Sequence, residues 1–454
     1  MRTLAFCSGR SEEITQKAID EARSDVSNEL VAQAAAGRIP GIVCLSATAG
    51  DTKLRFTHKS LQHYLIMEEL LLKLKDADEH KHRVVDVLKK ELPTTQQALA
   101  DAWWRPVWQL CIEKRPRFAV EMLQALDLKK LSLPKAKQSW PGAAVLFANL
   151  LVTEQIDRAD ELLQTGMPID QEVEDALVRQ QGAERDTWHK ILKNEQREQA
   201  NKKLAAKIVA KVCKKLPGMS SVEDFLGRGA YDLATAEIRE AIDEAVSFGG
   251  KFRITSKIPE HVSGTSVLLR GKALDHFEKK TDSVNAIEVQ KGEEVIIKLM
   301  KQRSHLEREV GNRLGWLLQS AVVPLVATSD DAEGGFKKRW AEDATSAIDQ
   351  LRVNQELKEA MKSSKYAHGI VMKAAQRNLF AILIQERNSL PDAVKITKGL
   401  AACLQMLHQH NRVHADVKPL NVVRMPNGLV QLIDLDASVV VGEKLTDKTS
   451  TAAG

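Results

Sequence analysis

The stretch Val413-His-Ala-Asp-Val-Lys-Pro-Leu-Asn421, followed by Leu432-Ile-Asp-Leu-Asp436, carries the most specific pattern in this chain. It places an aspartate, a lysine and an asparagine within one short loop, and a second aspartate 13 residues after the asparagine. Carboxylate and amide oxygens bind magnesium, and a lysine neutralises phosphate charge. The pattern therefore indicates a site for phosphoryl transfer.

Each of the four residues has its own chemical role in such a site. Asp416 can accept the proton of a substrate hydroxyl, and Lys418 can neutralise the phosphate in transit. Asn421 and Asp434 can hold the Mg²⁺ that bridges the phosphates of ATP. We therefore predict Asp416 and Lys418 as catalytic residues and Asn421 and Asp434 as metal ligands, with ATP as a substrate.

The composition is that of a globular protein with more than one domain. The chain has 454 residues, of which 43% are hydrophobic and 28% are charged, enough for roughly two to four domains. Its 66 basic side chains exceed its 61 acidic ones by only five, so nucleic acid is not an expected partner. The cysteines form no CxxC pair, and neither a signal peptide nor an apolar run of about 20 residues is evident. We expect a cytoplasmic protein without a membrane span.

The first part of the chain has helical periodicity. We predict one helical region over residues 1–100 and another over residues 101–195. The segment Asp101–Ile112 contains three of the seven tryptophans, and Trp104 and Trp108 share one helical face. This pattern favours a helix packed against its neighbours, and the alternative is an aromatic binding surface.

The segment Phe56-Thr-His-Lys-Ser-Leu-Gln-His-Tyr-Leu65 resembles the F-x-H-x-S-x-Q-E-Y-L segment that follows the nucleotide-binding core of NACHT-type signalling NTPases. His63 stands where that family has a glutamate, and no G-x-x-x-x-G-K-[ST] sequence is present. The resemblance implies that residues 1–100 are the tail of such a module, without nucleotide hydrolysis. The alternative is an ordinary amphipathic helix. Separately, we expect the helical N-terminal region to bind signalling partners.

A basic helical linker is predicted over residues 196–255. The segment from Lys193 to Leu216 contains eight basic and two acidic residues, and its apolar residues recur every four positions. Such a helix can bind an acidic membrane surface or a calmodulin-like partner. We favour the alternative, in which the apolar stripe is packed and the lysines are solvated. Pro217-Gly218 is expected to end the helix.

Short β-branched segments followed by longer helical patterns indicate an α+β unit over residues 256–454. The expected strands are Thr265–Leu269, Glu294–Met300, Ala321–Ala327, His368–Met372 and Leu429–Ile433. The expected helices are Ser304–Leu318, Asp343–Met361 and Asp392–His410.

The segments quoted at the outset resemble the catalytic core of a eukaryotic protein kinase of the serine/threonine type. The family's H-R-D-x-K-x-x-N loop stands here as His414-Ala-Asp-Val-Lys-Pro-Leu-Asn421, and its D-F-G motif as Asp434-Leu-Asp436. The resemblance implies a small β-rich lobe followed by a helical large lobe, and transfer of the γ-phosphate of ATP to hydroxyl groups of a protein substrate. It covers residues 256–454, less than half of the chain.

Upstream segments extend the resemblance to the nucleotide. Val295-Ile-Ile-Lys298 is similar to the family's V-A-I-K strand, which makes Lys298 the residue that grips the α- and β-phosphates. The helix that follows is expected to supply its acidic partner, for which Glu309 fits best and Glu307 second.

The segment His368-Gly-Ile-Val-Met-Lys-Ala-Ala375 looks like the strand and hinge that contact adenine in this family. Met372 would then lie at the back of the nucleotide pocket. The resemblance therefore implies four ATP-binding residues, namely Lys298, Glu309, Met372 and Ala374.

Several positions depart from the family pattern. Ala415 stands for an arginine that pairs with a phosphate on the activation segment, so phosphorylation there is not the expected switch. Asp436 replaces a glycine, and Ile296 replaces a small alanine beside adenine. No G-x-G-x-x-G loop precedes Lys298 at the expected distance, and no A-P-E motif follows Asp434, so the domain is expected to be C-terminally incomplete.

These departures leave two further interpretations open. One is a pseudokinase or scaffold that signals by association, without catalysis. The other is a remnant of an NTPase-type signalling protein whose activity resided in segments that this chain lacks.

Overall fold

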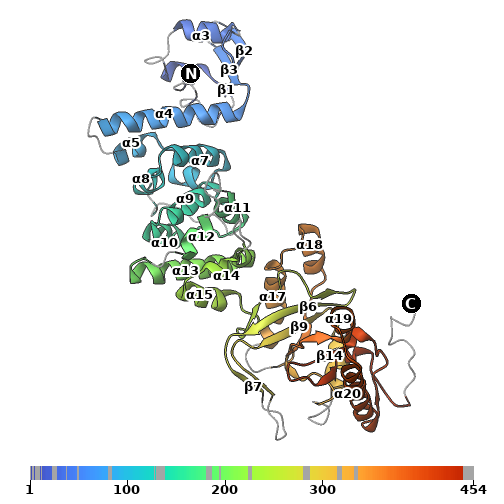
Figure 1. Cartoon of the computed structure of the whole chain (residues 1–454). Coiled ribbons are helices and arrows are strands. Elements are labelled where there is room, and N and C mark those ends of the chain that lie inside the picture. Colours follow the sequence, from blue (N-terminus) through green and yellow to red (C-terminus); the bar gives the residue numbers. More distant parts are fainter. Residues whose placement is uncertain are drawn as a thin grey trace. The chain divides into compact units, whose positions relative to one another are not determined.

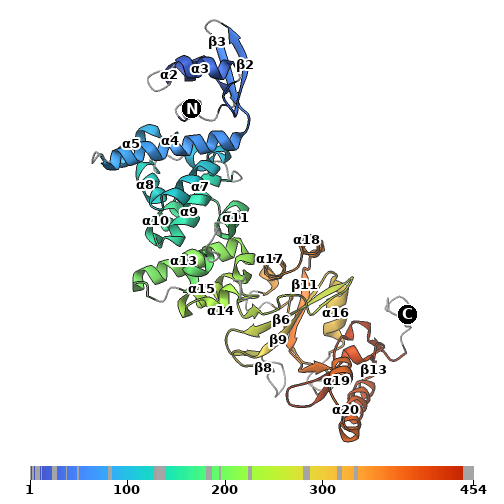
Figure 2. The same cartoon turned by 45° about the horizontal axis from the view of Figure 1, so that its top comes forward.

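A computed structural model of the chain describes residues 2, 5, 11, 13–22, 28–36, 38–48, 51–79, 84–126, 128, 139–179, 187–193, 196–222, 228–279, 287–313, 320–331 and 336–442. The chain divides into two compact units, Met1–Leu216 with Glu223–Ile238, and Pro217–Val222 with Arg239–Gly454 (Figures 1 and 2). Both helices and small antiparallel sheets are present, so the fold is mixed α/β. Among the described helices, none has the length and apolar character that a membrane span requires.

The first unit begins with a three-stranded antiparallel sheet of order β1-β3-β2, so residues 1–100 are not helical throughout. Its elements are β1 (Glu13–Ile14), α2 (Gln16–Glu21), α3 (Asn28–Ala35), β2 (Ile42–Thr48) and β3 (Asp51–Phe56). Ile42, Leu54 and Phe56 are buried, whereas Val43 and Leu45 are exposed. This period of two is that of strands with one solvated face, and the helical prediction overlooked it.

The helices of the first unit pack around α9 (Pro141–Val152), which contacts α6, α7, α8, α10, α11 and α12. Residues 143–151 of α9 are buried, as expected for a helix that is apolar on nearly every face. The α-helices between β3 and the basic helix, besides α9, are α4 (Lys59–Glu79), α5 (Val84–Glu91), α6 (Thr95–Ala100), α7 (Arg105–Lys114), α8 (Phe118–Ala125), α10 (Ile156–Gln164), α11 (Gln171–Arg179) and α12 (Thr187–Lys193) in the described residues.

One expectation about this region, the packing of the tryptophan-rich segment, is met. Trp108 and Cys111 in α7 are fully buried, and the indole Nε1 of Trp108 donates to the carbonyl oxygen of Ala98 at 2.7 Å. The tryptophan-rich segment is therefore confirmed as a packed helix. The segment that resembles the NACHT tail forms the end of β3 and the first turns of α4.

The basic helix is confirmed as α13 (Gln199–Lys215), and it ends just before Pro217. Its apolar face is buried in the first unit, including Ile208, Val209 and Val212, while Lys207 and Lys211 are exposed. Because the apolar face is already covered, it is not available to a membrane or a calmodulin-like partner. The segment 196–255 is thus not one linker but α13, α14 (Ala230–Leu233), α15 (Ala236–Val246) and β4 (Phe252–Ile254).

The second unit is built on an antiparallel sheet of order β10-β11-β9-β6-β4, in which β5 also pairs with β6. Its strands are β5 (His261–Val262), β6 (Ser266–Ala273), β9 (Glu294–Met300), β10 (Leu325–Thr328) and β11 (His368–Lys373). α17 (Phe336–Asp349) covers the sheet, and Trp340 meets Phe248 edge-on with ring centroids 4.8 Å apart. The sheet is therefore fixed by one aromatic and aliphatic core.

Most expected elements of this unit are present, with shifted ends. The strand Glu294–Met300 is found with the predicted bounds. The helix predicted over Asp343–Met361 is two helices, α17 and α18 (Gln355–Ser363), because Asn354 accepts a hydrogen bond from Leu357 N and starts a new helix. The helix predicted over Ser304–Leu318 is α16 (Arg303–Gly311), and residues 314–319 lie outside the described part.

The last part of the second unit contains two α-helices, two short 3₁₀ helices (η6 and η7) and several short strands. They are β12 (Arg377–Asn378), α19 (Leu379–Gln385), α20 (Leu390–Gln409), β13 (Arg412–Val413), η6 (Pro419–Asn421), β14 (Val422–Arg424), β15 (Val430–Leu432), η7 (Leu435–Ala437) and β16 (Val439–Val440). A further hairpin joins β7 (Phe277–Lys279) to β8 (Ile287–Val289). In α20 only Cys403 and Leu407 are buried, and Leu390 is 78% exposed, so one helix carries both a core face and an uncovered apolar face.

Candidate functional site

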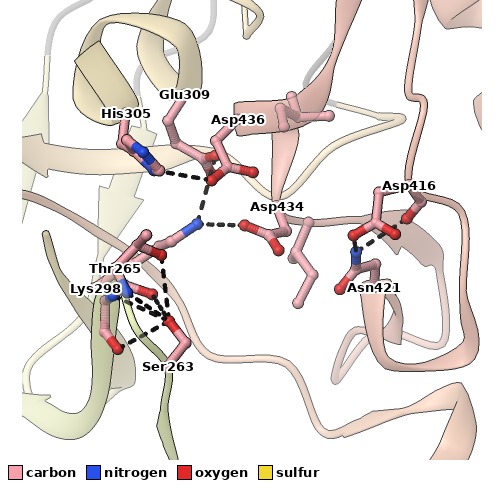
Figure 3. Close-up of polar contacts among 12 residues, drawn as sticks. Ser263, Thr265, Lys298, His305, Glu309, Asp416, Asn421, Asp434 and Asp436 are labelled. Carbon is pink, nitrogen blue, oxygen red and sulfur yellow. Dashed lines mark hydrogen bonds and ion pairs between the residues drawn. The ribbon is translucent and has the colours of Figure 1, made fainter. Parts of the chain in front are cut away.

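Lys298 lies in the middle of β9, which is hydrogen-bonded on both sides. It stands opposite Ile370 of β11 and Leu268 of β6, and only 5% of the residue is exposed. A buried ammonium needs compensating negative charge. Its Nζ makes an ion pair with Asp434 Oδ1 and lies 3.6 Å from Glu309 Oε2 (Figure 3). Residues from three separate segments therefore meet at this lysine.

Glu309 is the acidic partner because it is on the inner face of α16. It is fully buried, and its Oε1 accepts a hydrogen bond from Arg313 Nη2 at 2.7 Å. Glu307, the second choice from the sequence, pairs instead with Arg303 on the exposed face of the helix at 2.9 Å. The helical period places residues two apart on different faces, which separates the two glutamates.

Asp434 adopts a left-handed backbone conformation, with φ at 65° and ψ at 65°. This conformation is uncommon outside glycine, although aspartate tolerates it better than most residues. Burial alone would raise the pKa of the Asp434 carboxyl, but the charge and hydrogen bond of Lys298 outweigh it and lower the pKa. For Lys298, burial opposes the charged form, yet Glu309, Asp434 and Asp436 together raise its pKa. Both groups are therefore ionised at neutral pH.

Asp436 adds a third carboxylate to the same place. Its Oδ2 lies 3.3 Å from Nδ1 of His305, which is on α16. Burial, and then the charge of Asp434, raise the pKa of the Asp436 carboxyl. Ligand atoms of Glu309, Asp434 and Asp436 lie within 4.8 Å of one another, a spacing that suits a metal ion. Lys298 contacts two of the three, so an ammonium already balances this acidic cluster.

The other predicted residues form a second group on the loop before β14. Asp416 Oδ2 accepts hydrogen bonds from Lys418 Nζ at 2.7 Å and from Asn421 Nδ2 at 2.9 Å. Asn421 Nδ2 also donates to the main-chain oxygen of Asp416 at 3.0 Å. Since both bonds use the amide nitrogen, the amide oxygen of Asn421 is turned away from Asp416, as Figure 3 shows. That oxygen is the atom available to a metal ion.

A hairpin brings the two groups together. Strands β14 and β15 pair antiparallel, with Val422 opposite Leu432, and Ile433 N donates to Asn421 O at 3.0 Å. The spacing of 13 residues between Asn421 and Asp434 is therefore the length of this hairpin. Figure 3 shows Asp434 between Lys298 on one side and Asp416 and Asn421 on the other.

His414 connects the loop that carries Asp416 with the turn that carries Asp434. It is 1% exposed, and its Nε2 lies 3.0 Å from the carbonyl oxygen of Ile433, next to Asp434. Burial lowers the pKa of the imidazole, so it is neutral at physiological pH. Ser438 Oγ donates to the carbonyl oxygen of His414 at 3.1 Å. The two segments that carry Asp416 and Asp434 are thus connected by these two hydrogen bonds.

The residues predicted to contact adenine make contacts of a different kind. Met372 stands opposite Ile296 on β9 and packs in an apolar cluster with Val423 and Met425. The backbone N–H of Ala374 donates to the carbonyl oxygen of Glu294 at 3.0 Å. That N–H is therefore not a donor for a nucleotide here, and Ala374 can offer only its carbonyl and side chain.

The turn between β5 and β6 lies close to Lys298, although it has no glycine-rich sequence. Ser263 Oγ accepts hydrogen bonds from Thr265 N at 3.3 Å and Ser266 N at 3.0 Å (Figure 3). Leu268, two residues into the same strand, is the partner of Lys298 in the sheet. The turn itself lies beside the end of β9, where Lys301 N donates to the carbonyl oxygen of Thr265 at 3.1 Å, and it has one glycine, Gly264.

Apart from Glu309, the residues that hold α16 in place were not predicted from the sequence. The spacing of His305, Glu309 and Asn312 places them on one helical face, and Arg313 follows Glu309 by four positions. The shared face and the Glu309–Arg313 pair could therefore have been predicted from the sequence. The partner of Asn312 is Arg412, 100 residues away, and no local signal predicts it.

No protein-family model matches this chain, and none of the curated proteins matches it significantly.

Proposed function

We propose that this chain is a serine/threonine protein kinase, with the kinase-like fold in the second unit. The observation that carries the proposal is the meeting of Lys298, Glu309 and Asp434, from three segments, beside Asp416 and Asn421. A phosphoryl-transfer site needs this set, because catalysis rests on positioning and on balancing phosphate charge.

Each group has a defined part in the proposed reaction. Lys298, held by Glu309, binds the α- and β-phosphates of ATP. Asp416 takes the proton of a serine or threonine hydroxyl, whose oxygen then forms a bond to the γ-phosphorus. The bond from that phosphorus to the bridging oxygen of ADP breaks, and Lys418 neutralises charge on the transferring group.

Magnesium fits this arrangement as the companion of ATP. The Asp434 oxygen not engaged by Lys298 and the amide oxygen of Asn421 are the two protein ligands in the proposal. Bound Mg²⁺ would supply charge neutralisation at the β- and γ-phosphates. Protein substrates and signalling partners bound by the helical N-terminal region belong to the same proposal, as does a cytoplasmic location, where Mg·ATP is abundant.

The test is phosphate transfer from radiolabelled ATP to a degenerate serine/threonine peptide library, with and without Mg²⁺. Asp434→Ala and Asp416→Asn should each lower transfer by at least about a hundredfold. Asp349→Ala is the matched control, because Asp349 is also an ion-paired aspartate of the second unit, bound to Lys362 at 2.5 Å. Transfer by the Asp434 variant at the level of the control would refute the proposal.

The second candidate is a pseudokinase or scaffold. It is favoured by the Ala374 N–H, which is already bonded to Glu294, and by Asp436, which adds like charge beside Asp434. Thermal unfolding with Mg·ATP separates the two candidates. A nucleotide present at 100 times its Kd stabilises the folded state by about 2.7 kcal/mol. No shift in Tm, together with no transfer, would favour the scaffold.

A further inference from the structure

Asn312 lies at a junction of the three segments that carry the site. It is the C-terminal cap of α16, three residues after Glu309, and it is only 5% exposed. Its Nδ2 donates to the carbonyl oxygens of Leu435 and Ser438, each at 2.9 Å. Its Oδ1 accepts from Arg412 Nη1 at 2.7 Å. One side chain thus makes three polar contacts, of which the two with main-chain oxygens are buried and the one with Arg412 is partly buried.

Each contacted segment leads directly to a residue of the site. Leu435 follows Asp434, and the main-chain stretch from Leu435 to Ser438 includes Asp436. Arg412 begins β13, which runs into Asp416, and it pairs with Val440 of β16. Asn312 therefore connects the helix with Glu309, the turn with Asp434 and the strand that precedes Asp416.

The orientation of the amide is determined by its partners. Two carbonyl oxygens require donors, and a guanidinium requires an acceptor, so only one of the two amide orientations satisfies all three contacts. Arg412 thereby keeps Nδ2 directed at the turn. An aspartate at 312 would retain the contact with Arg412 but would place a carboxylate oxygen against two carbonyls.

We propose that Asn312 and Arg412 are positioning residues that dock α16 on the 434–438 turn, so that the Lys298–Glu309 pair is assembled without a phosphorylated segment. This inference rests on the proposed function, because its consequence is a nucleotide site in which the Lys298–Glu309 pair is always formed. At the other end of the same helix face, His305 contacts Asp436, so α16 is held at two points, seven residues apart.

The second unit offers a matched control for this role. Gln350 is likewise a buried amide, 6% exposed, and its Nε2 donates to two main-chain oxygens, those of Val246 and Ser346, each at 3.2 Å. Among the described residues, these hydrogen bonds reach neither α16 nor the loops that carry Asp416 and Asp434. Gln350→Ala therefore removes the same kind of group from the same unit.

The first readout needs no nucleotide. In the full-length protein, acylation of Lys298 by an amine-reactive reagent is followed by peptide mass spectrometry. Asn312→Ala and Asn312→Asp should each label Lys298 about tenfold faster than the unchanged chain, the equivalent of about 1.4 kcal/mol. Gln350→Ala should label at the unchanged rate. Equal labelling in the Asn312 and Gln350 variants would overturn the inference.

The second readout is kinetic and separates positioning from loss of folding. Arg412→Met and Asn312→Ala should each lower kcat for phosphate transfer at saturating Mg·ATP by about tenfold, whereas Gln350→Ala keeps kcat at a comparable loss of Tm. Treatment of the unchanged chain with a phosphatase should leave kcat unaltered; a large loss would refute assembly without a phosphate. If the unchanged chain binds no Mg·ATP while labelling behaves as expected, the docking role stands and the proposed function fails.

Discussion

Replacing Lys298 by methionine tests whether its ammonium balances the acidic cluster. Removal of one member of a buried ion pair costs about 3–5 kcal/mol when the partner keeps no counter-charge. Two features reduce this cost here. Glu309 retains Arg313 at 2.7 Å, and the side chain of Asp434 is 34% exposed, so water can hydrate it. We therefore expect Lys298→Met to lower the free energy of unfolding by about 2 kcal/mol at neutral pH.

The matched control is Lys362→Met. Lys362 also pairs with two carboxylates, Asp349 at 2.5 Å and Glu359 at 3.8 Å, but it is 27% exposed. Loss of a solvated pair costs less than about 1 kcal/mol. The assay is amide hydrogen exchange of β9 peptides at increasing urea, which gives the opening free energy of this sheet. Equal costs for the two variants would show that Lys298 is not a buried counter-ion.

The pH dependence of this cost has a definite sign. Lys298 lowers the pKa of Asp434, so the pair contributes stability above the unfolded pKa of the aspartate, and that contribution is lost as pH falls through the folded value. The cost of Lys298→Met should therefore be full at pH 7 and should shrink below about pH 4. A cost that is constant from pH 7 to pH 3 would contradict the ion pair.

Three further substitutions test the charge balance and the packing, each by urea or thermal unfolding. Asp436→Asn should stabilise the fold at pH 7, because a carboxyl with a raised pKa costs stability once it ionises; the gain should vanish below about pH 4, and a gain that persists there would count against it. Gly369→Ala should cost about 2–3 kcal/mol, since the added Cβ would collide with the main-chain oxygen of Lys298 and would lie 2.5 Å from the Trp340 ring; a cost near zero would disprove this close packing. On α20, Leu390→Ser should change stability by less than about 0.5 kcal/mol, whereas the buried Leu407→Ala should cost about 2–5 kcal/mol, and similar costs would mean that the exposed face is covered.

Local patterns predicted the elements that carry the site. The β-branched run Glu294–Met300 is found as a strand with those bounds. The helix predicted from Asp392 is found as α20, but it begins at Leu390 because Ser389 and Asp392 form a capping box that the apolar pattern did not reveal. The periodicity of apolar residues failed to predict the break within the helix expected over Asp343–Met361. The break between α17 and α18 depends on the capping side chain of Asn354, which a periodicity of apolar residues does not detect.

The sequence by itself determined which side chains stand on the two loops and how many residues separate them along the chain. The five-residue spacing of Asp416 and Asn421 was enough to predict them as residues of one loop. The hairpin between Asn421 and Asp434 requires only the pairing of two neighbouring strands. No local pattern brings Lys298 to Asp434, 136 residues away; only the family resemblance led us to expect them in one site, and the tertiary structure decided their direct contact. The contact between Asn312 and Arg412 was decided by the tertiary structure alone. The physical reason is that periodicity specifies which face of a helix or strand is buried, but not which distant segment covers that face. That choice depends on the packing of the whole unit.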